Sequence, residues 1–248
     1  MMRHYLARAG AFLLPALLAA APAAAQGQMN LIDAGKTLAT RLGAATGFAN
    51  VPTLTNADAP LVRAAFDADA VRAMPLDLDT VSNSCIAIGT AIVAYTQFAT
   101  RTGNAEAAML RLQDEIALGT VAGNVCVQRG FHAVSAVVET MPEAARGGVQ
   151  GPLKQMRDGA EQTIMGTLQA SSATTLSVKN RTAMLAAVLE DAPVVAASFP
   201  AGERQRVRQL ILGWQARLPV ADRKTVAAIA AAFAAPACNV LCKAASAN

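Results

Sequence analysis

The chain of 248 residues contains 21 lysines and arginines against 17 acidic residues. Arg3 and Arg8 lie in the first 25 residues, and without that segment the formal charge falls to +2. A charge this close to balance argues against a protein dominated by attraction to nucleic acid or to a membrane surface. We therefore expect no nucleic-acid partner.

Residues 1–25 have the pattern of a secretory signal peptide. Basic residues open the segment, an apolar run follows at 11–20, and alanines occupy 23–25, as a signal cleavage site requires. The apolar run is short for a stop-transfer helix. We therefore expect cleavage before Gln26, a periplasmic or secreted location, and no transmembrane anchor after cleavage.

Residues 26–248 are expected to form one all-helical exported domain. No long Pro/Ser linker divides them, and their length suits one large domain. Apolar residues recur at steps of three and four, whereas alternating apolar and polar residues are hard to find. The pattern predicts an all-α bundle of about seven or eight helices around a central helical hairpin.

The segment before the hairpin predicts a helix over 31–42, a loop over 52–60 and a short helix opened by Pro60. Two acidic motifs follow, Asp67-Ala68-Asp69 and Asp77-Leu78-Asp79. Neither continues into a calcium-binding loop, which needs further oxygen ligands, a central glycine and a closing glutamate. We interpret both motifs as helix N-caps.

The hairpin is predicted over about 79–141, with its turn at Thr102-Gly103-Asn104. Its first helix has no charged residue from 81 to 100. An apolar stripe at helical spacing is formed by Val81, Cys85, Ile88, Ile92, Tyr95 and Ala99. Ile86, Val93 and Phe98 lie off this stripe, so more than one side of the helix is apolar. Its polar serines and threonines favour a buried core helix over a membrane span.

The return helix is predicted to begin at Asn104, a suitable N-cap. Its apolar seam contains three glycines, Gly119, Gly123 and Gly130. Glycine costs about 1 kcal/mol in a helix interior relative to alanine, so their regular placement suggests close approach of a neighbouring helix. The alternative is a groove for a flat apolar ligand beside Gly119 and Gly123. The residues of the first helix that would complete this groove are Ile88, Ile92 and Tyr95.

Four further helical segments are predicted over 152–168, 177–199, 203–218 and 226–233. Pro193 is expected to kink or restart the second of these, because it has no amide hydrogen to donate. The segment 203–218 is the most amphipathic, with arginines apart from the face that carries Trp214. Such a helix can lie on an anionic membrane or bind a partner. An ordinary surface helix with a solvated charged face and Trp214 in the core is preferred, because amphipathicity alone does not distinguish surface packing from membrane binding.

Four cysteines in an exported chain point to two disulfides. Folding the hairpin about residues 103–104 places Cys126 one turn, roughly 6 Å, from the position opposite Cys85. We therefore favour Cys85–Cys126 and Cys238–Cys242. Two alternatives concern Cys238 and Cys242: they pin the C-terminal tail to the hairpin, or their thiolates bind a soft ion such as Cu(I).

Motifs for enzymatic chemistry are scarce. His132 is the only histidine after residue 25, so no histidine pair exists for zinc. Neither a nucleophile elbow nor a phosphate-binding glycine loop occurs. Adjacent acids such as Asp114-Glu115 and Glu190-Asp191 point in different directions on a helix. We expect no cofactor and favour a non-enzymatic protein, with a carboxylate-only hydrolase as the enzymatic alternative.

These observations favour an exported, non-enzymatic helical protein that binds protein or envelope partners. One alternative is a carrier of an apolar small molecule such as a lipid, held beside Gly119 and Gly123. Another is a copper or thiol-redox protein that uses Cys238 and Cys242.

Overall fold

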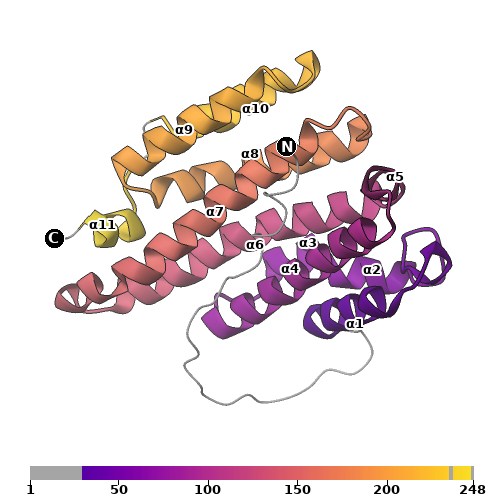
Figure 1. The fold of residues 1–248 in the computed structure, drawn as a ribbon. Helices are drawn as coiled ribbons and strands as arrows, with labels where there is room; N and C mark the ends of the chain where they lie inside the picture. Colours follow the sequence, from indigo (N-terminus) through magenta and orange to yellow (C-terminus); the bar gives the residue numbers. More distant parts are fainter. Residues whose placement is uncertain (1–29, 235–236, 247–248) are drawn as a thin grey trace.

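A computed structural model describes residues 30–234 and 237–246, and over these residues the protein is all-α with no β-strand (Figure 1). The signal peptide predicted at residues 1–25 lies outside the described residues. The α-helices are α1 (Leu31–Ala44), α2 (Ala59–Ala65), α3 (Ala68–Ala73), α4 (Leu78–Arg101), α5 (Ala105–Arg111), α6 (Gln113–Thr140), α7 (Gln150–Ser171), α8 (Val178–Ala197), α9 (Ala201–Gln215), α10 (Arg223–Ala232) and α11 (Val240–Ser246). Short 3-10 helices are η1 (Phe48–Asn50), η2 (Glu143–Val149) and η3 (Val220–Asp222).

The described residues contain eleven α-helices, more than the seven or eight predicted. The difference comes from short elements: α3, α5 and α11 each have six or seven residues. A helix of this length makes fewer than two turns, so its apolar residues do not repeat often enough to produce a periodic pattern.

Helices α4 and α6 form the centre of the N-terminal half. α1 and α2 pack against α4, and α3 packs against α6 (Figure 1). Large side chains removed from solvent in this core include Leu38, Phe66, Ile88, Tyr95 and Leu112. The inner side of α4 is therefore buried against other helices of the chain, as the polar residues in its sequence predicted.

Helices α7 to α11 form a second core with the C-terminal part of α6. α8 lies against α6, α7 and α10, and α9 packs against α7 and α10. Phe199 lies between Phe131 and Phe233, with ring centroids 6.4 and 6.1 Å away. On α6, Val125 belongs to the first core and Phe131 to the second. The prediction placed all the other helices around the hairpin. Instead, α6 is long enough to contribute residues to two cores, and the second core forms around its C-terminal part.

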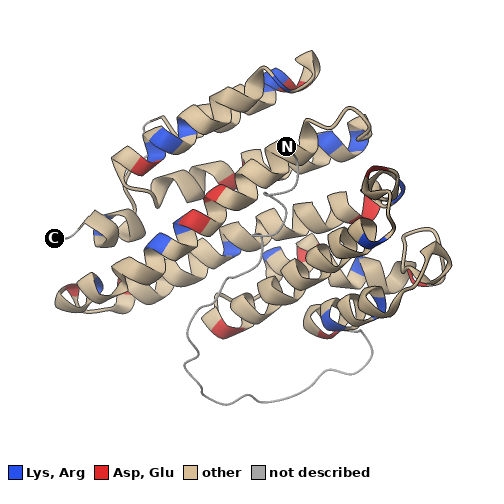
Figure 2. Cartoon of the chain, viewed as in Figure 1, with Lys and Arg blue, Asp and Glu red and all other residues tan. Residues whose placement is uncertain are grey.

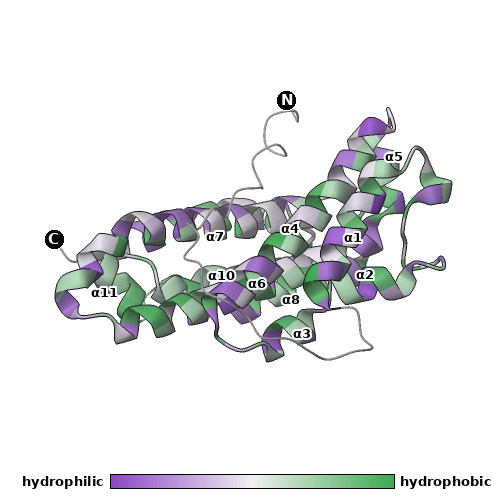
Figure 3. Cartoon of the chain, turned by 90° about the horizontal axis from the view of Figure 1, so that it is seen from below, coloured by the Kyte–Doolittle hydropathy of each residue, from purple (hydrophilic) through white to green (hydrophobic). Residues whose placement is uncertain are grey.

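The predicted helix over 152–168 corresponds to α7, which begins two residues before Pro152. Hydrophilic residues recur along α7 in Figure 3, as expected for a surface helix with one buried side. That buried side includes Leu153, Met156, Ala160, Ile164 and Leu168.

The hairpin turn lies where the sequence predicted it. Gly103 has φ 78°, in the left-handed region that favours glycine. The Asn104 side chain accepts a hydrogen bond of 3.1 Å from the Ala107 amide, which confirms its role as an N-cap. Three other predicted caps are confirmed by hydrogen bonds from backbone amides to the side chains of Asp67, Asp77 and Ser177.

The return helix is not continuous, which corrects the prediction of one helix from Asn104. α5 ends at Arg111 and α6 begins at Gln113. The Leu112 amide still donates to the Ala108 carbonyl, and the Leu112 carbonyl still accepts from Ile116, so the break is a kink. Leu112 is fully buried at the kink. No proline or glycine lies at the kink in the sequence. We attribute the kink to the burial of Leu112 in the core.

The chain does not restart at Pro193, since α8 continues through it to Ala197. A proline in a helix interior costs about 3 kcal/mol because it removes one hydrogen bond and crowds the preceding turn. α8 packs against three neighbouring helices, and residues on both sides of Pro193, such as Ala192 and Val195, are buried. The free energy gained by this packing exceeds the cost of placing a proline inside the helix.

α1 approaches α4 closely at Gly35, and a substitution there should be costly. A Cβ on Gly35 would lie 2.9 Å from the Ala87 Cβ and 3.0 Å from its carbonyl carbon and oxygen. Backbone cannot move aside without separating the helices. We expect Gly35→Ala to lower the free energy of unfolding, measured in urea, by about 2 kcal/mol.

Gly89→Ala in α4 is the matched control. Nothing lies within 4 Å of a Cβ placed on Gly89. Because alanine is the better helix former, we expect this substitution to raise the free energy of unfolding by roughly 0.5–1 kcal/mol. Equal effects of the two substitutions would contradict the close approach at Gly35.

Candidate functional site

A hollow of about 350 Å³ lies between α1 and the first half of α4. Its lining residues are Ile32 and Lys36 of α1, and Asn83, Ile86, Ala87 and Thr90 of α4. Steps of three or four residues place each set on one side of its helix. Ile86 is 45% exposed, so the hollow offers accessible apolar surface beside polar side chains. We call this hollow, with the outward side of α4, the α1–α4 face.

The outward side of α4 is uncharged over five turns. Figure 2 shows the helix without charged residues between Asp79 and Arg101 near its ends. Among the described residues, α4 is the one helix long and apolar enough to cross a membrane. Its inner side packs against α1 and α6, however, as in a core helix. The outward side of α4 is therefore uncharged, while its inner side is held in place by α1 and α6.

The predicted Cys85–Cys126 disulfide is present, with the two Cα atoms 5.5 Å apart. This separation is within the usual range for disulfides. The bond joins α4 to α6 directly beside Ile86. The wall of the hollow is therefore covalently attached to the central helix.

The predicted Cys238–Cys242 disulfide is also present, with Cα atoms 5.3 Å apart. Cys238 precedes α11, and Cys242 lies within it. Between them, Asn239 accepts hydrogen bonds from the Leu241 and Cys242 amides and donates one of 2.8 Å to Ser198. The bond therefore stabilises the start of α11 beside the end of α8. In this disulfide-bonded form the two sulfurs are not thiolates and do not offer a copper site.

The residues predicted to line a ligand groove are packed against one another. A Cβ on Gly119 would lie 2.9 Å from the Ile92 Cγ1 and 3.0 Å from the Phe66 ring, and one on Gly123 would lie 3.4 Å from the Ile92 Cδ1. Tyr95 and Ile88 are fully buried. The space beside Gly119 is thus filled by side chains of the protein. At Gly119 and Gly123 this agrees with close packing rather than with a groove, whereas a Cβ on Gly130 would meet nothing within 4 Å.

A second hollow, of about 260 Å³, lies beside the kink and is polar. Its buried Glu115 accepts a hydrogen bond of 2.7 Å from the Leu54 amide, and the Arg111 guanidinium lies 4.2 Å from the Phe48 ring centroid. Nearby, burial and the charge of Glu115 raise the pKa of Tyr95, whose hydroxyl donates to the Pro52 carbonyl. These contacts hold the loop after α1 against the hairpin.

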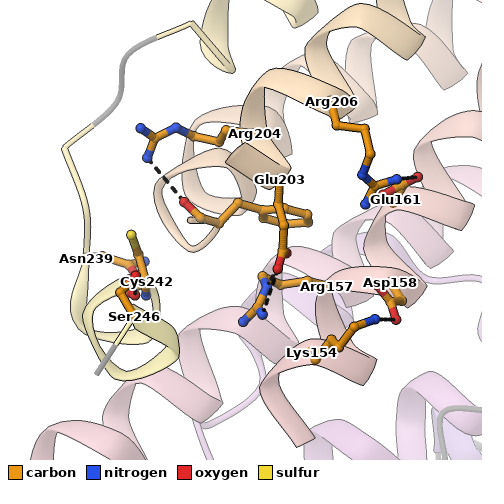
Figure 4. A network of polar contacts seen from close by, with 11 residues as sticks. Lys154, Arg157, Asp158, Glu161, Glu203, Arg204, Arg206, Asn239, Cys242 and Ser246 are labelled. Atoms are coloured by element: carbon orange, nitrogen blue, oxygen red, sulfur yellow. Dashed lines mark hydrogen bonds and ion pairs between the residues drawn. The ribbon is translucent and has the colours of Figure 1, made fainter. Parts of the chain in front are cut away.

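Ion pairs join α7 to α9 (Figure 4). The buried Arg157 donates to both carboxylate oxygens of Glu203, at 2.7 and 3.2 Å, and Arg206 lies 2.6 Å from Glu161. Arg204 donates to a backbone carbonyl at 3.2 Å. Several arginines of the predicted basic helix are thus engaged within the protein. This part of α9 packs as an ordinary surface helix.

The titratable side chains at the second hollow are Arg111, Asp114 and Glu115. Glu115 accepts a hydrogen bond from the Leu54 amide, and Asp114 accepts one from Asn180. Within residues 30–234 and 237–246, no three His, Cys, Asp or Glu side chains are placed to hold a metal ion. His132 is exposed on α6. Asp191 is buried, and burial together with the charge of Glu190 raises its pKa to about 7, but it lines neither hollow.

The residues of α4 predicted to bind a ligand lie on its inner side, and the site on its outer side was not predicted. One signal was present, since Ile86 lies off the apolar stripe and leaves a large apolar residue on the other side of the helix. The contribution of α1 had no such signal, because it depends on how α1 lies across α4.

Comparisons with models of protein families, with curated proteins and with solved structures find no match, so the α1–α4 face has to be interpreted from its own geometry.

Proposed function

We propose that this is an exported, non-enzymatic binding protein that recognises a protein partner through the α1–α4 face. The observation that carries the proposal is the exposed Ile86 in a hollow between α1 and α4, two helices in close contact at Gly35 and Ala87. Protein interfaces are centred on apolar anchors in desolvated pockets, with polar groups around them. Lys36, Asn83 and Thr90 are polar groups of this kind beside Ile86.

A protein fits this face better than a small apolar ligand does. Pockets for small molecules bury most of the ligand's surface. The hollow is instead an open depression between two helices, and the space beside Gly119 is filled by Ile92 and Phe66.

The first test is crosslinking in the exported fraction of the native host. A photoreactive residue replaces the exposed Asn83, and the crosslinked partner is identified and purified. We expect Ile86→Asp to weaken binding of that partner at least tenfold, because it places a charge in the centre of the interface.

Val137→Asp is the matched control, since Val137 is 41% exposed on α6 and is not a lining residue of the hollow. It should leave the affinity unchanged, and both variants should keep the far-UV circular dichroism of the wild type. The absence of a crosslink at position 83, or equal affinities of the Ile86 variant and the wild type, would refute the proposal.

A further inference from the structure

Two strongly exposed valines lie at the same end of the C-terminal half. Val178 at the start of α8 is 72% exposed, and Val220 at the start of η3 is 76% exposed. Among the described residues these are the highest exposures of large hydrophobic side chains. An ion pair of 3.6 Å between Arg181 and Asp222 joins the two segments. Figure 1 shows the start of α8 and the connection from α9 to α10 at one end of the molecule.

Exposed cations lie close to these valines in the sequence. We call the set the basic end, and its members are Val178, Lys179, Trp214, Arg217, Val220, Arg223 and Lys224. The acids in contact with this region are Asp222, which pairs with Arg181, and Asp114, which accepts a hydrogen bond from Asn180. Four exposed cations therefore lie beside two carboxylates that already have partners. The nearly neutral chain concentrates positive charge here.

Trp214 adds an aromatic ring at the border of the core. It is partly buried, and the Arg217 guanidinium lies 4.7 Å from its ring centroid. Tryptophan is enriched at membrane interfaces, because its ring is largely apolar and its N–H is polar. The Arg217 guanidinium stacked on the Trp214 ring would place a positive charge at the same depth in a membrane interface as the ring.

We propose that the basic end docks on an anionic lipid surface, with the two valines entering the headgroup region. Apolar side chains flanked by lysine and arginine are the combination that binds anionic membranes. Val178 and Val220 stand at the starts of α8 and η3, are 72% and 76% exposed, and line neither hollow. Single exposed apolar residues among cations suit a lipid surface better than an acidic protein, whose interface is centred on an anchor in a pocket. The basic end shares no residue with the α1–α4 face, so this proposal goes beyond the protein-binding function and is independent of it.

The test uses the mature chain, residues 26–248, and vesicles that contain phosphatidylglycerol. Trp214 is the only tryptophan, so its fluorescence reports on the basic end alone. We expect a blue shift and protection from an aqueous quencher with these vesicles at low salt, and neither effect with phosphatidylcholine vesicles. Each surface cation contributes about fivefold to binding, so Lys179→Glu with Lys224→Glu should weaken co-sedimentation by at least about 25-fold.

The charge-matched control is Arg63→Glu with Lys243→Glu, since both cations are exposed on other helices and line neither hollow. This variant should keep most of the binding, and Val220→Asp alone should reduce the blue shift. Equal losses in both double variants would overturn the proposal, because they would show attraction by net charge only. Failure of the wild type to bind anionic vesicles, or binding of an acidic protein at the basic end without vesicle binding, would also overturn it.

Discussion

Replacing Cys85 and Cys126 together by alanine should lower the free energy of unfolding by about 4 kcal/mol, on the loop-closure relation for a disulfide. The bond joins residues 41 apart in the sequence, so it removes many conformations from the unfolded chain. It also holds α4 against α6 beside the α1–α4 face. The measurement is urea unfolding followed by far-UV circular dichroism, with the mid-point and slope compared between variant and wild type.

The second disulfide is the internal control for this prediction. Cys238 and Cys242 are only four residues apart, so the same relation gives about 2 kcal/mol for their replacement. Their bond also fixes the short helix α11, which adds Leu241 and Ala244 to the second core. A double replacement at 85 and 126 that costs no more than the replacement at 238 and 242 would contradict the role assigned to the central bond.

Asp191→Asn should raise the free energy of unfolding by up to about 4 kcal/mol at pH 8, because each unit of pKa shift corresponds to about 1.36 kcal/mol. Both carboxyl oxygens of Asp191 are buried without a hydrogen-bond partner in the described structure. Burial, and then the charge of Glu190, raises its pKa from 3.8 to about 7. The nearby Arg72 offsets this only in part, and it is paired with Glu190 and Asp69.

The pH dependence follows from the direction of this shift. Between pH 3.8 and about 7 the folded protein holds a proton on Asp191 that the unfolded chain has lost, so the contribution of Asp191 to stability falls as the pH rises. Asparagine has no charge to bury, and its advantage should disappear near pH 4. Asp79→Asn, at an exposed position, should change stability by less than about 0.5 kcal/mol throughout. An effect of Asp191→Asn that is the same at pH 4 and pH 8 would contradict a buried carboxylate.

Local signals in the sequence were sufficient for much of the fold. Asn104, Asp77 and Ser177 cap helices as predicted, because an N-cap needs only one side chain and an amide three residues away. The turn at Gly103 follows from its freedom to adopt positive φ. The Cys85–Cys126 pair could be predicted because a hairpin of known turn position fixes which residues face each other.

The candidate sites could not be predicted from such local signals. The α1–α4 face needs Ile32 of α1 beside Ile86 of α4, and no spacing in the sequence relates residues 54 positions apart. The basic end likewise combines Val178 with Val220, whose segments are joined by the Arg181–Asp222 ion pair only because the successive helices α8, α9 and α10 run antiparallel. Sequence periodicity identifies the side of a helix that is buried, but not which other helix lies beside its exposed side.

By itself, then, the sequence determined the helical class, most helix starts and the covalent pairs, because each depends on residues close in the chain or related by one turn. The tertiary structure decided the kink at Leu112, the passage of α8 through Pro193 and the burial of Asp191. It also decided that side chains fill the space beside Gly119 and Gly123, whereas a Cβ on Gly130 would meet nothing within 4 Å. These features result from packing between distant helices, whose free energy exceeds the local preferences that the sequence displays.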